Sequence, residues 1–174
     1  QSFLDAFAAL PEPKILVHGG GKLASQLAER LAIPVNMVNG RRITDAETVE
    51  VITMVYGGKV NKSIVAGLQA RNCNAIGFSG ADGNTILSVK RPVKEIDFGF
   101  VGDVVAVDSE MIDKLLSIGI TPAFCAITHD GNGQLFNTNA DTIACELARG
   151  LSANYEVTLN YCFEKNGVLL DIND

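Results

Sequence analysis

Short apolar runs alternate along this chain with helical patterns of ten residues or more, and this alternation restricts the possible folds more than any other feature. β-branched runs bounded by Pro or Gly, such as Ile-Leu-Val at 15–17, favour short buried strands. Strands joined by helices of this length form βαβ units, which give a parallel sheet with helices on both faces. The sequence therefore predicts an α/β fold, a three-layer αβα sandwich with a mainly parallel sheet.

The expected elements follow one another along the whole chain. Residues 84–108 interrupt the alternation with two strand patterns around a polar turn region, which predicts a β-hairpin excursion from the sheet. We expect helices at 1–10, 22–33, from 44 towards 71, at 109–120 and at 140–152, and strands at 15–17, 35–40, 74–80, 121–129 and 155–163.

Two patterns predict how individual helices begin and pack. Leu23, Leu27 and Leu31 recur at i, i+4 and i+8, which predicts one stripe facing a core. Thr44 followed by Glu47 fits the capping box, in which a hydroxyl and a carboxylate satisfy the first amides of a helix. We therefore expect a long helix to begin at Thr44.

Charge and hydropathy exclude two classes of partner. The formal net charge is −6, the pI is about 4.9, and the 14 basic residues are spread along the chain. Binding to nucleic acid or to an anionic membrane surface requires clustered basic residues, so neither partner is expected. No apolar run reaches the roughly 18 to 20 residues that a membrane span needs, and the sequence predicts a soluble protein.

The cysteines and histidines give no metal or redox motif. Four cysteines lie in apolar stretches without C-x-x-C spacing, which predicts buried, reduced thiols. His18 and His129 are far apart and lack the spacing of zinc ligands, so no metal site is expected. The cysteines are Cys73, Cys125, Cys145 and Cys162.

The motif VHGGGK at 17–22 places three glycines between a predicted strand and a predicted helix. A P-loop is excluded, because Leu16 stands where that motif requires its first glycine and Leu23 where it requires a hydroxyl. Glycines also let backbone N–H groups approach an anion, while the following helix presents its positive N-terminal end there. A tight turn without a ligand needs only about one glycine, so three favour an anion-binding turn.

A dinucleotide site is a further alternative for the same glycines. Gly19, Gly21 and Ala24 match the pattern G-x-G-x-x-[GA], but the region after the next strand has no clear ribose-binding acid. Arg41 and Arg42 stand there instead, and two arginines suit a 2′-phosphate. An NADP-binding reductase domain therefore remains an alternative interpretation of these residues.

Arg41 and Arg42 can also be explained in other ways. They follow the strand expected at 35–40, where active sites of open parallel sheets gather, and a guanidinium can clamp a carboxylate or a phosphate. A solvated charge pair beside a helix start is the structural alternative.

The stretch NTNAD at 137–141 allows two interpretations. Thr138 with Asp141 fits a second capping box, whereas Asn137 and Asn139 add amide groups that such a cap does not require. Spacing alone supports a cap and a ligand site equally.

Seven ordered motifs give the chain a more specific resemblance. In order they are VHGGGK, NGRRITDAE, NKSIVAGLQ, GADGN, FGFVGDV, ITHDGNGQ and NTNADTIACELA, and the likeness as a whole runs from about Lys14 to Asp174. The chain resembles the N-acetylglutamate kinases of the amino-acid kinase family, whose αβα sandwich suits the expected order of helices and strands.

The resemblance implies a reaction, its cofactors and its partners. The γ-phosphoryl group of ATP, with Mg²⁺ bound through the nucleotide, would pass to the side-chain carboxylate of N-acetyl-L-glutamate in arginine biosynthesis. Another N-acylglutamate, such as N-succinylglutamate, and a regulatory module without catalysis remain alternatives. A carboxylate nucleophile is already ionised at pH 7 and needs no general base. The resemblance further implies a cytoplasmic homodimer.

The resemblance also implies roles for the three glycines. The N–H of Gly20 would donate to the phosphoryl group in transfer, and Gly21 would help to hold the acyl amino acid. Gly19 and Gly20 would lie at the nucleotide phosphates.

Three further residues match functional positions of the family. Arg42 and Asn137 would hold the α-carboxylate of the substrate. Asp141 would orient the catalytic lysines, a role that suits an acid at a helix N-terminus. These lysines belong to a K-x-G-G strand and a later glycine-rich loop that this sequence does not contain, and we assign no such role to Lys22.

The resemblance divides the chain into two parts. We expect residues 1–152 to form the acyl-amino-acid-binding lobe and residues 153–174 to form the start of a truncated nucleotide-binding lobe. By itself, the 174-residue stretch is expected to be inactive.

Overall fold

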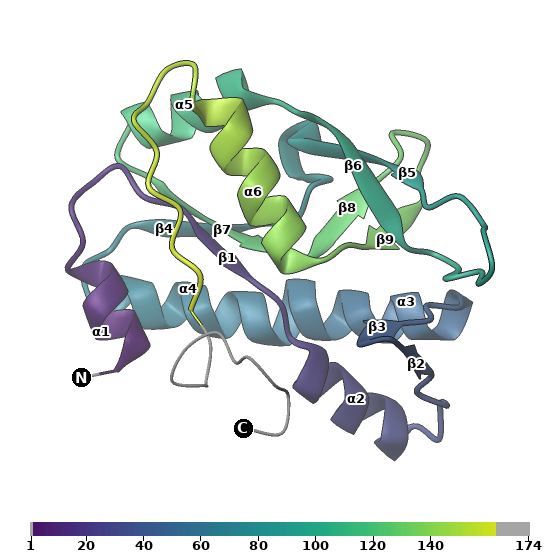
Figure 1. Cartoon of the computed structure of the whole chain (residues 1–174). Coiled ribbons are helices and arrows are strands. Elements are labelled where there is room, and N and C mark those ends of the chain that lie inside the picture. Colours follow the sequence, from purple (N-terminus) through teal and green to yellow (C-terminus); the bar gives the residue numbers. More distant parts are fainter. Residues whose placement is uncertain (1, 163–174) are drawn as a thin grey trace, which may run out of the picture.

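A parallel sheet lies at the centre of the protein (Figure 1). The structure is a computed structural model and describes residues 2–162. β7 (Thr121–Cys125) lies between β1 (Leu16–His18) and β4 (Ala75–Phe78), and both neighbours run parallel to it. Every residue of β7 is buried, because helices cover both faces of the sheet. The predicted parallel sheet is confirmed.

A second sheet has the strand order β6-β5-β8-β9. β5 (Ile86–Lys90) and β6 (Gly102–Val107) form the predicted β-hairpin excursion. The strand expected at 121–129 is divided, because β8 (Ile127–His129) leaves β7 after one residue and joins this second sheet. There it also pairs with β9 (Leu135–Asn137).

The segment expected as one strand at 35–40 is instead half of a small hairpin. β2 (Met37–Val38) pairs antiparallel with β3 (Arg41–Arg42). Asn39 and Gly40 form the turn with φ angles of 49° and 73°, which Asn and Gly tolerate best. The hairpin returns the chain towards the sheet.

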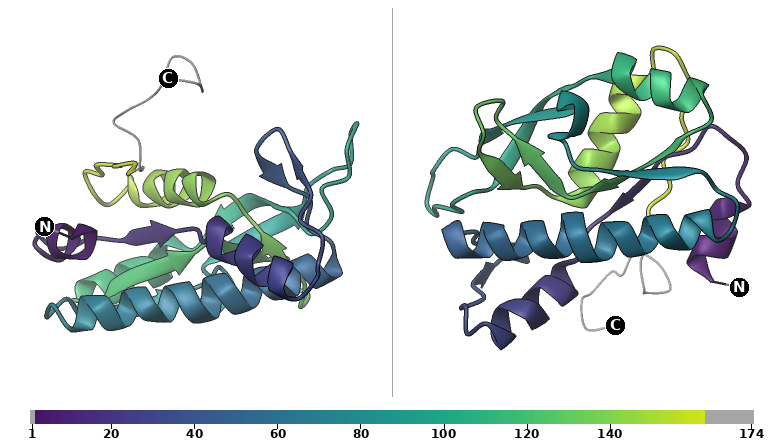
Figure 2. Two further views of the ribbon diagram at one scale, coloured as in Figure 1. Left: turned by 90° about the horizontal axis from the view of Figure 1, so that it is seen from below. Right: turned by 180° about the vertical axis from the view of Figure 1, so that it is seen from behind.

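One long helix covers one face of the parallel sheet. It consists of α3 (Ala46–Ile52), the π-helix η1 (Thr53–Val60) and α4 (Asn61–Gln69), which follow one another without a break (Figures 1 and 2). Gly57 and Gly58 lie in the π-helical segment, and glycine weakens a helix interior.

The other helices complete the layers. α5 (Ser109–Ser117) and α6 (Ala140–Leu151) cover the opposite face of the sheet. α1 (Phe3–Ala8) lies against α4, and α2 (Gly21–Arg30) lies against α3 and η1. Helices on both sides of the sheet confirm the predicted αβα architecture.

The main core joins the three layers. The fully buried ring of Phe124 in β7 packs against Phe78, with 5.5 Å between the ring centroids. Ile52 of the long helix belongs to the same cluster, as do Ile112 of α5 and Ile143 of α6. Aliphatic residues therefore supply most of this core.

The leucine stripe predicted for α2 is wrong. Leu23 and Leu31 are 45% and 51% exposed, whereas Ala24 and Ala28 are buried. Leu27 does pack against the main core. The helix turns its small residues inward, and this lets its backbone approach α3 and η1 closely.

Both predicted capping boxes are wrong by one residue. The N-cap of α3 is Asp45 and the N-cap of α6 is Asn139, and each side chain accepts a hydrogen bond from the N–H three residues later. Thr44 and Thr138 are buried and make tertiary contacts instead.

The strand predicted at 155–163 is absent from residues 155–162, and residue 163 lies outside the described residues. No described strand runs beside this segment to pair with it, and it passes next to α6 instead (Figure 1). The Oη of Tyr161 donates to the carbonyl oxygen of Asp141, 3.4 Å away. Most of the predicted second lobe, residues 163–174, also lies outside the described residues.

The prediction of buried thiols holds for two of the four cysteines. Cys73 and Cys125 are buried, and burial raises the pKa of the Cys125 thiol to about 12. Cys145 and Cys162 are exposed, because one lies on the outer face of α6 and the other in the segment without strand pairing.

No helix within residues 2–162 is both long enough and apolar enough to cross a membrane.

A buried lysine closes the C-terminal end of α1. The Nζ of Lys14 donates to the carbonyl oxygens of Ala8 and Leu10, at 2.9 and 2.8 Å, and pairs with Glu12 at 3.1 Å. The side chain of Lys14 is only 8% exposed. These carbonyls have no partner within a helix, and the Lys14 side chain satisfies both.

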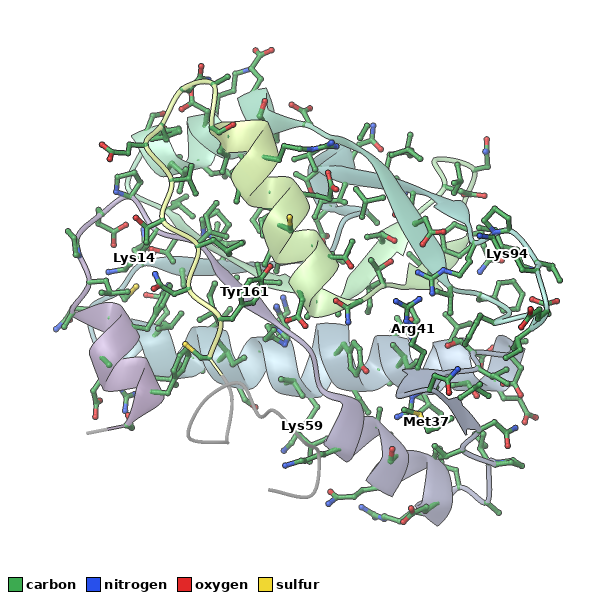
Figure 3. The ribbon with its side chains drawn as sticks, viewed as in Figure 1. Lys14, Met37, Arg41, Lys59, Lys94 and Tyr161 are labelled. Atoms are coloured by element: carbon green, nitrogen blue, oxygen red, sulfur yellow. The ribbon has the colours of Figure 1, made fainter. Side chains whose placement is uncertain are left out.

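We predict that Lys14→Met lowers the free energy of unfolding by about 1–3 kcal/mol, because two hydrogen bonds from a buried charged donor are lost. Lys94→Met is the control, since Lys94 is exposed at the other end of the molecule (Figure 3), and it should change stability by less than about 0.5 kcal/mol. Chemical denaturation of the full-length protein measures both. Equal stability of the two variants would contradict this role for Lys14.

Candidate active site

Gly19, Gly20 and Gly21, called the glycine turn below, connect β1 to α2 at the carboxyl end of the parallel sheet. Gly20 is the N-cap of α2, and a Cβ atom there would lie 2.8 Å from Cδ1 of Tyr56 in η1. Any side chain at this position would therefore collide with the long helix. Within the described part of the chain, no oxygen accepts a hydrogen bond from the N–H of Gly20 or Gly21.

A second helix begins beside the same turn. The ideal Cβ position of Gly19 lies 4.0 Å from Cβ of Ala140, the first residue of α6. Two helix N-termini therefore face one region, and each carries a partial positive charge. Two helix N-termini favour the binding of an anion in this region more strongly than one N-terminus would.

Arg42 reaches the glycine turn from the β2–β3 hairpin. Its Nη2 donates to the carbonyl oxygen of Gly21 at 3.2 Å and to Oγ of Ser25 at 2.9 Å. Arg42 is buried, whereas the neighbouring Arg41 is exposed (Figure 3). The two arginines thus do not form a solvated pair, and only Arg42 belongs to the site.

Thr44 links Arg42 to Asn137. Its fully buried Oγ1 donates to the carbonyl oxygen of Arg42 at 3.4 Å and accepts a hydrogen bond from Nδ2 of Asn137 at 3.1 Å. The second proton of this Nδ2 remains for another acceptor. The structure thus joins two predicted substrate ligands that are far apart in the sequence.

Asp141 lies in the first turn of α6, next to the glycine turn, with an exposed side chain. The stretch 137–141 was left undecided between a cap and a ligand site, and in the structure Asn139 is the helix cap in place of Thr138. The structure therefore brings five of the predicted positions around the end of β1: Gly19, Gly20, Gly21, Arg42 and Asn137, with Asp141 at the border.

Sequence reasoning missed Thr44 and Tyr56 as parts of the site. Burial raises the pKa of Tyr56, while the nearby Arg42 charge opposes this shift. The hydroxyl of Tyr56 lies 3.8 Å from the ideal Cβ position of Gly21. No local pattern marks either residue, because both reach the site through tertiary packing.

The arrangement suits a ligand with two anionic ends. Arg42 and Asn137 offer donors for a carboxylate, and a guanidinium binds that group well. The free N–H groups of the glycine turn and the two helix N-termini offer donors for a second anion such as a phosphoryl group.

Comparison with known proteins gives a consistent result. The model of the amino acid kinase family matches residues 1–169. The acetylglutamate kinase of Bacteroides fragilis is 61% identical over 100% of this chain and 67% of that protein. The acetylglutamate kinase of Methanopyrus kandleri is 38% identical over 98% of this chain and 70% of that protein. The chain spans about two thirds of the length of these relatives.

Solved structures show the same fold. The smu.665 protein of Streptococcus mutans matches with a TM-score of 0.73 and 23% identity, over 79% of this chain and 56% of that one. The N-acetylglutamate synthase of Neisseria gonorrhoeae, solved with coenzyme A and N-acetyl-glutamate, has a TM-score of 0.67 and 18% identity, over 83% and 34% of the two chains. At these identities the likeness confirms the fold class alone.

We predict that Gly20→Ala lowers the free energy of unfolding by about 1–3 kcal/mol, because its Cβ would overlap the Tyr56 ring. Gly21→Ala is the matched control, since its nearest contact would be 3.8 Å away, and it should cost less than about 1 kcal/mol. Thermal and chemical unfolding of both variants test this difference. A stable Gly20→Ala protein would show that the turn does not need this close approach.

The protonation of His18 gives a pH prediction. Burial lowers the pKa of His18, so below about pH 6.5 the unfolded state binds the proton better than the folded state does. Stability should therefore fall as the pH drops below about 6.5, before the carboxylates titrate near pH 4. Unfolding free energies of the wild type and His18→Asn measured at several pH values test this. An equal decline in both proteins would exclude His18 as its source.

Proposed function

The chain belongs to the amino acid kinase family, and we propose that the protein containing it transfers the γ-phosphoryl group of ATP to the side-chain carboxylate of N-acetyl-L-glutamate. The product is an acyl phosphate, N-acetylglutamyl 5-phosphate, in arginine biosynthesis. The observation that carries the proposal is the link from Arg42 through Thr44 to Asn137, placed beside a glycine turn with two helix N-termini.

Arg42 and Asn137 hold the α-carboxylate of the substrate in this proposal. Arg42 keeps Nε and Nη1 for the ligand, because Nη2 is occupied by Gly21 and Ser25. Asn137 adds the second proton of Nδ2, whose orientation Thr44 sets. The substrate is thereby anchored at one end, so that its side-chain carboxylate extends along the turn.

The glycine turn stabilises the phosphoryl group in transfer. An oxygen of the substrate carboxylate attacks the γ-phosphorus, a C–O–P link forms, and the bond to the bridging oxygen of ADP breaks. The N–H of Gly20 donates to the equatorial oxygens, Gly21 contacts the acyl amino acid, and Gly19 with Gly20 lies at the nucleotide phosphates. The free N–H groups and the absence of a Cβ at Gly20 fit a phosphoryl group.

Asp141 orients the positively charged groups that complete the reaction. Its place at the start of α6 beside Gly19 supports this role. Mg²⁺ enters the site bound to the nucleotide phosphates. The catalytic lysines belong to parts of the protein outside this chain.

The proposal extends to the organisation of the whole protein. Residues 1–152 form the acyl-amino-acid-binding lobe and residues 153–174 begin the nucleotide-binding lobe. The protein works as a cytoplasmic homodimer. These statements rest on the family membership.

The kinase proposal explains the arginines better than an NADP site does. The β2–β3 hairpin places the Arg42 side chain against Gly21 and Ser25. Arg42 is therefore not positioned at the end of β2 to bind the 2′-phosphate of NADP. A pair of arginines at the ribose is therefore not available.

We predict that Arg42→Ala in the full-length protein raises KM for N-acetylglutamate by about 10-fold to 100-fold, because the charge-assisted bonds to the carboxylate are lost. KM for ATP should change by less than about twofold. Steady-state ADP release measures both constants.

Arg41→Ala is the matched control, because Arg41 is exposed and adjacent in sequence, and it should leave both constants unchanged. Circular dichroism and thermal melting confirm that each variant is folded. A large loss of ATP affinity with an unchanged KM for N-acetylglutamate would show that Arg42 serves the nucleotide instead.

A further inference from the structure

One peptide group of the glycine turn has a fixed orientation. The Nδ1 of His18 lies 2.7 Å from the carbonyl oxygen of Gly19. A carbonyl oxygen only accepts hydrogen bonds, so Nδ1 must carry the proton. In a trans peptide the C=O and the following N–H point in opposite directions. This bond therefore directs the N–H of Gly20 away from the His18 ring.

Asn61 determines which nitrogen of His18 carries the proton. The Nδ2 of Asn61 lies 2.8 Å from the carbonyl oxygen of Ala123 and 3.0 Å from Nε2 of His18. Because the Ala123 carbonyl can only accept, the atom that faces both groups is the amide nitrogen. The Nε2 of His18 then accepts and has no proton, which leaves the proton on Nδ1.

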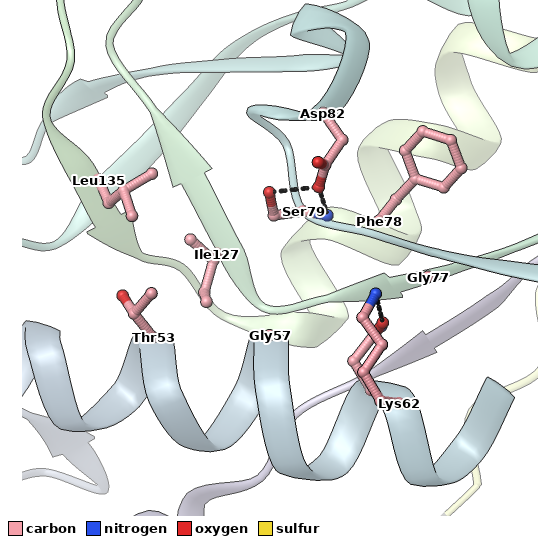
Figure 4. Close-up of a pocket in the computed structure, with 10 residues that line it drawn as sticks. Thr53, Gly57, Lys62, Gly77, Phe78, Ser79, Asp82, Ile127 and Leu135 are labelled. Atoms are coloured by element: carbon pink, nitrogen blue, oxygen red, sulfur yellow. Dashed lines mark hydrogen bonds between the residues drawn. The ribbon is translucent and has the colours of Figure 1, made fainter. Parts of the chain in front are cut away.

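Lys62 orients the other end of the Asn61 amide. Its Nζ donates to Oδ1 of Asn61 at 3.1 Å, marked by a dashed line in Figure 4. Lys62 lines a cavity of about 190 Å³ at the end of β4, which forms the edge of the parallel sheet opposite to β1. The contacts with Lys62 and with Ala123 therefore give the same assignment of the amide oxygen and nitrogen of Asn61.

The position of Asn61 is tightly constrained. The residue is 1% exposed, and a Cβ atom on Gly77 would lie 1.7 Å from Oδ1 of Asn61. The amide therefore occupies space that exists only because residue 77 is glycine. A rigid series of hydrogen bonds then runs from Ala123 in the central strand through Asn61 and His18 to the glycine turn.

We propose that His18 is a positioning residue that aims the N–H of Gly20 at the transferred phosphoryl group, with Asn61 fixing the required tautomer of the imidazole. The inference rests on the proposed function and assigns a role within the same site. His18 acts through the Gly19–Gly20 peptide, while its ring faces Asn61 on the long helix.

We expect the orientation of the Gly20 N–H to affect the stability of the transition state. Negative charge on the equatorial oxygens is stabilised by a donor that already points at them. Loss of one such donor typically costs about 10²-fold to 10³-fold in kcat, and a donor that is only misaligned should cost less, about 10-fold to 100-fold. Substrate affinity should change little, because Arg42 and Asn137 anchor the other end of the substrate.

Two substitutions separate the two nitrogens of His18 in the full-length protein. His18→Asn keeps an amide N–H near the position of Nδ1 and loses the group that bonds Asn61. His18→Gln keeps an acceptor near the position of Nε2 and loses the donor to Gly19. His129→Gln is the control for replacing a histidine, since His129 bonds Gly131 outside the site.

We expect His18→Gln to lower kcat by about 10-fold to 100-fold with KM for N-acetylglutamate within about twofold, while His18→Asn retains kcat within about threefold. His129→Gln should match the wild type. Thermal melting establishes that all variants are folded.

Other outcomes overturn the inference in distinguishable ways. Equal loss of kcat in both His18 variants, or losses that only follow their melting temperatures, would make His18 a structural link between β1 and the long helix. Full activity of a folded His18→Gln would also exclude the positioning role. A folded wild type that forms no acyl phosphate would overturn the proposed function itself.

Discussion

The site depends on a close approach between the glycine turn and the long helix. At Gly20 there is no room for a side chain, since its Cβ would lie 2.8 Å from the Tyr56 ring. This contact holds the start of α2 at the end of β1, where α6 also begins, and it leaves backbone N–H groups as donors. The partner of the turn is a π-helical segment, an irregularity that occurs frequently at functional sites.

The second constraint is the connection of distant segments by buried polar groups. Thr44 joins the end of the β2–β3 hairpin to the end of β9, and Asn61 joins β7 to the residue before the glycines. Such bonds are strong in a dry interior and costly when one partner is missing, so they hold side chains in one orientation. Chemistry that depends mainly on positioning, as phosphoryl transfer does, benefits from this rigidity.

The sequence predicted the layers and most of the elements correctly because strand and helix periodicities are local. The glycine turn was predicted from the three glycines themselves, whereas Arg42 and Asn137 were predicted as substrate ligands from motifs in the resemblance, and those two roles stay predictions. The predictions that were wrong concern features that depend on tertiary packing. Leu23 satisfies a helical stripe, yet α2 buries Ala24 because small residues permit a closer approach. Residues 155–162 have a strand pattern, but they pair with no described strand. Thr44 looked like a cap, and its burial between two segments could not be read from its neighbours in sequence.

The most direct test of the account is a hydroxylamine-trap assay for acyl phosphate on the full-length protein with MgATP. N-acetylglutamate, N-succinylglutamate, glutamate and aspartate are compared side by side. We predict hydroxamate from N-acetylglutamate, with glutamate and aspartate inactive because they lack the acyl group. Hydroxamate from N-succinylglutamate alone would correct the acyl group and keep the kinase. No hydroxamate from any of the four substrates, in a folded protein that still binds N-acetylglutamate, would contradict the central claim and indicate a regulatory module.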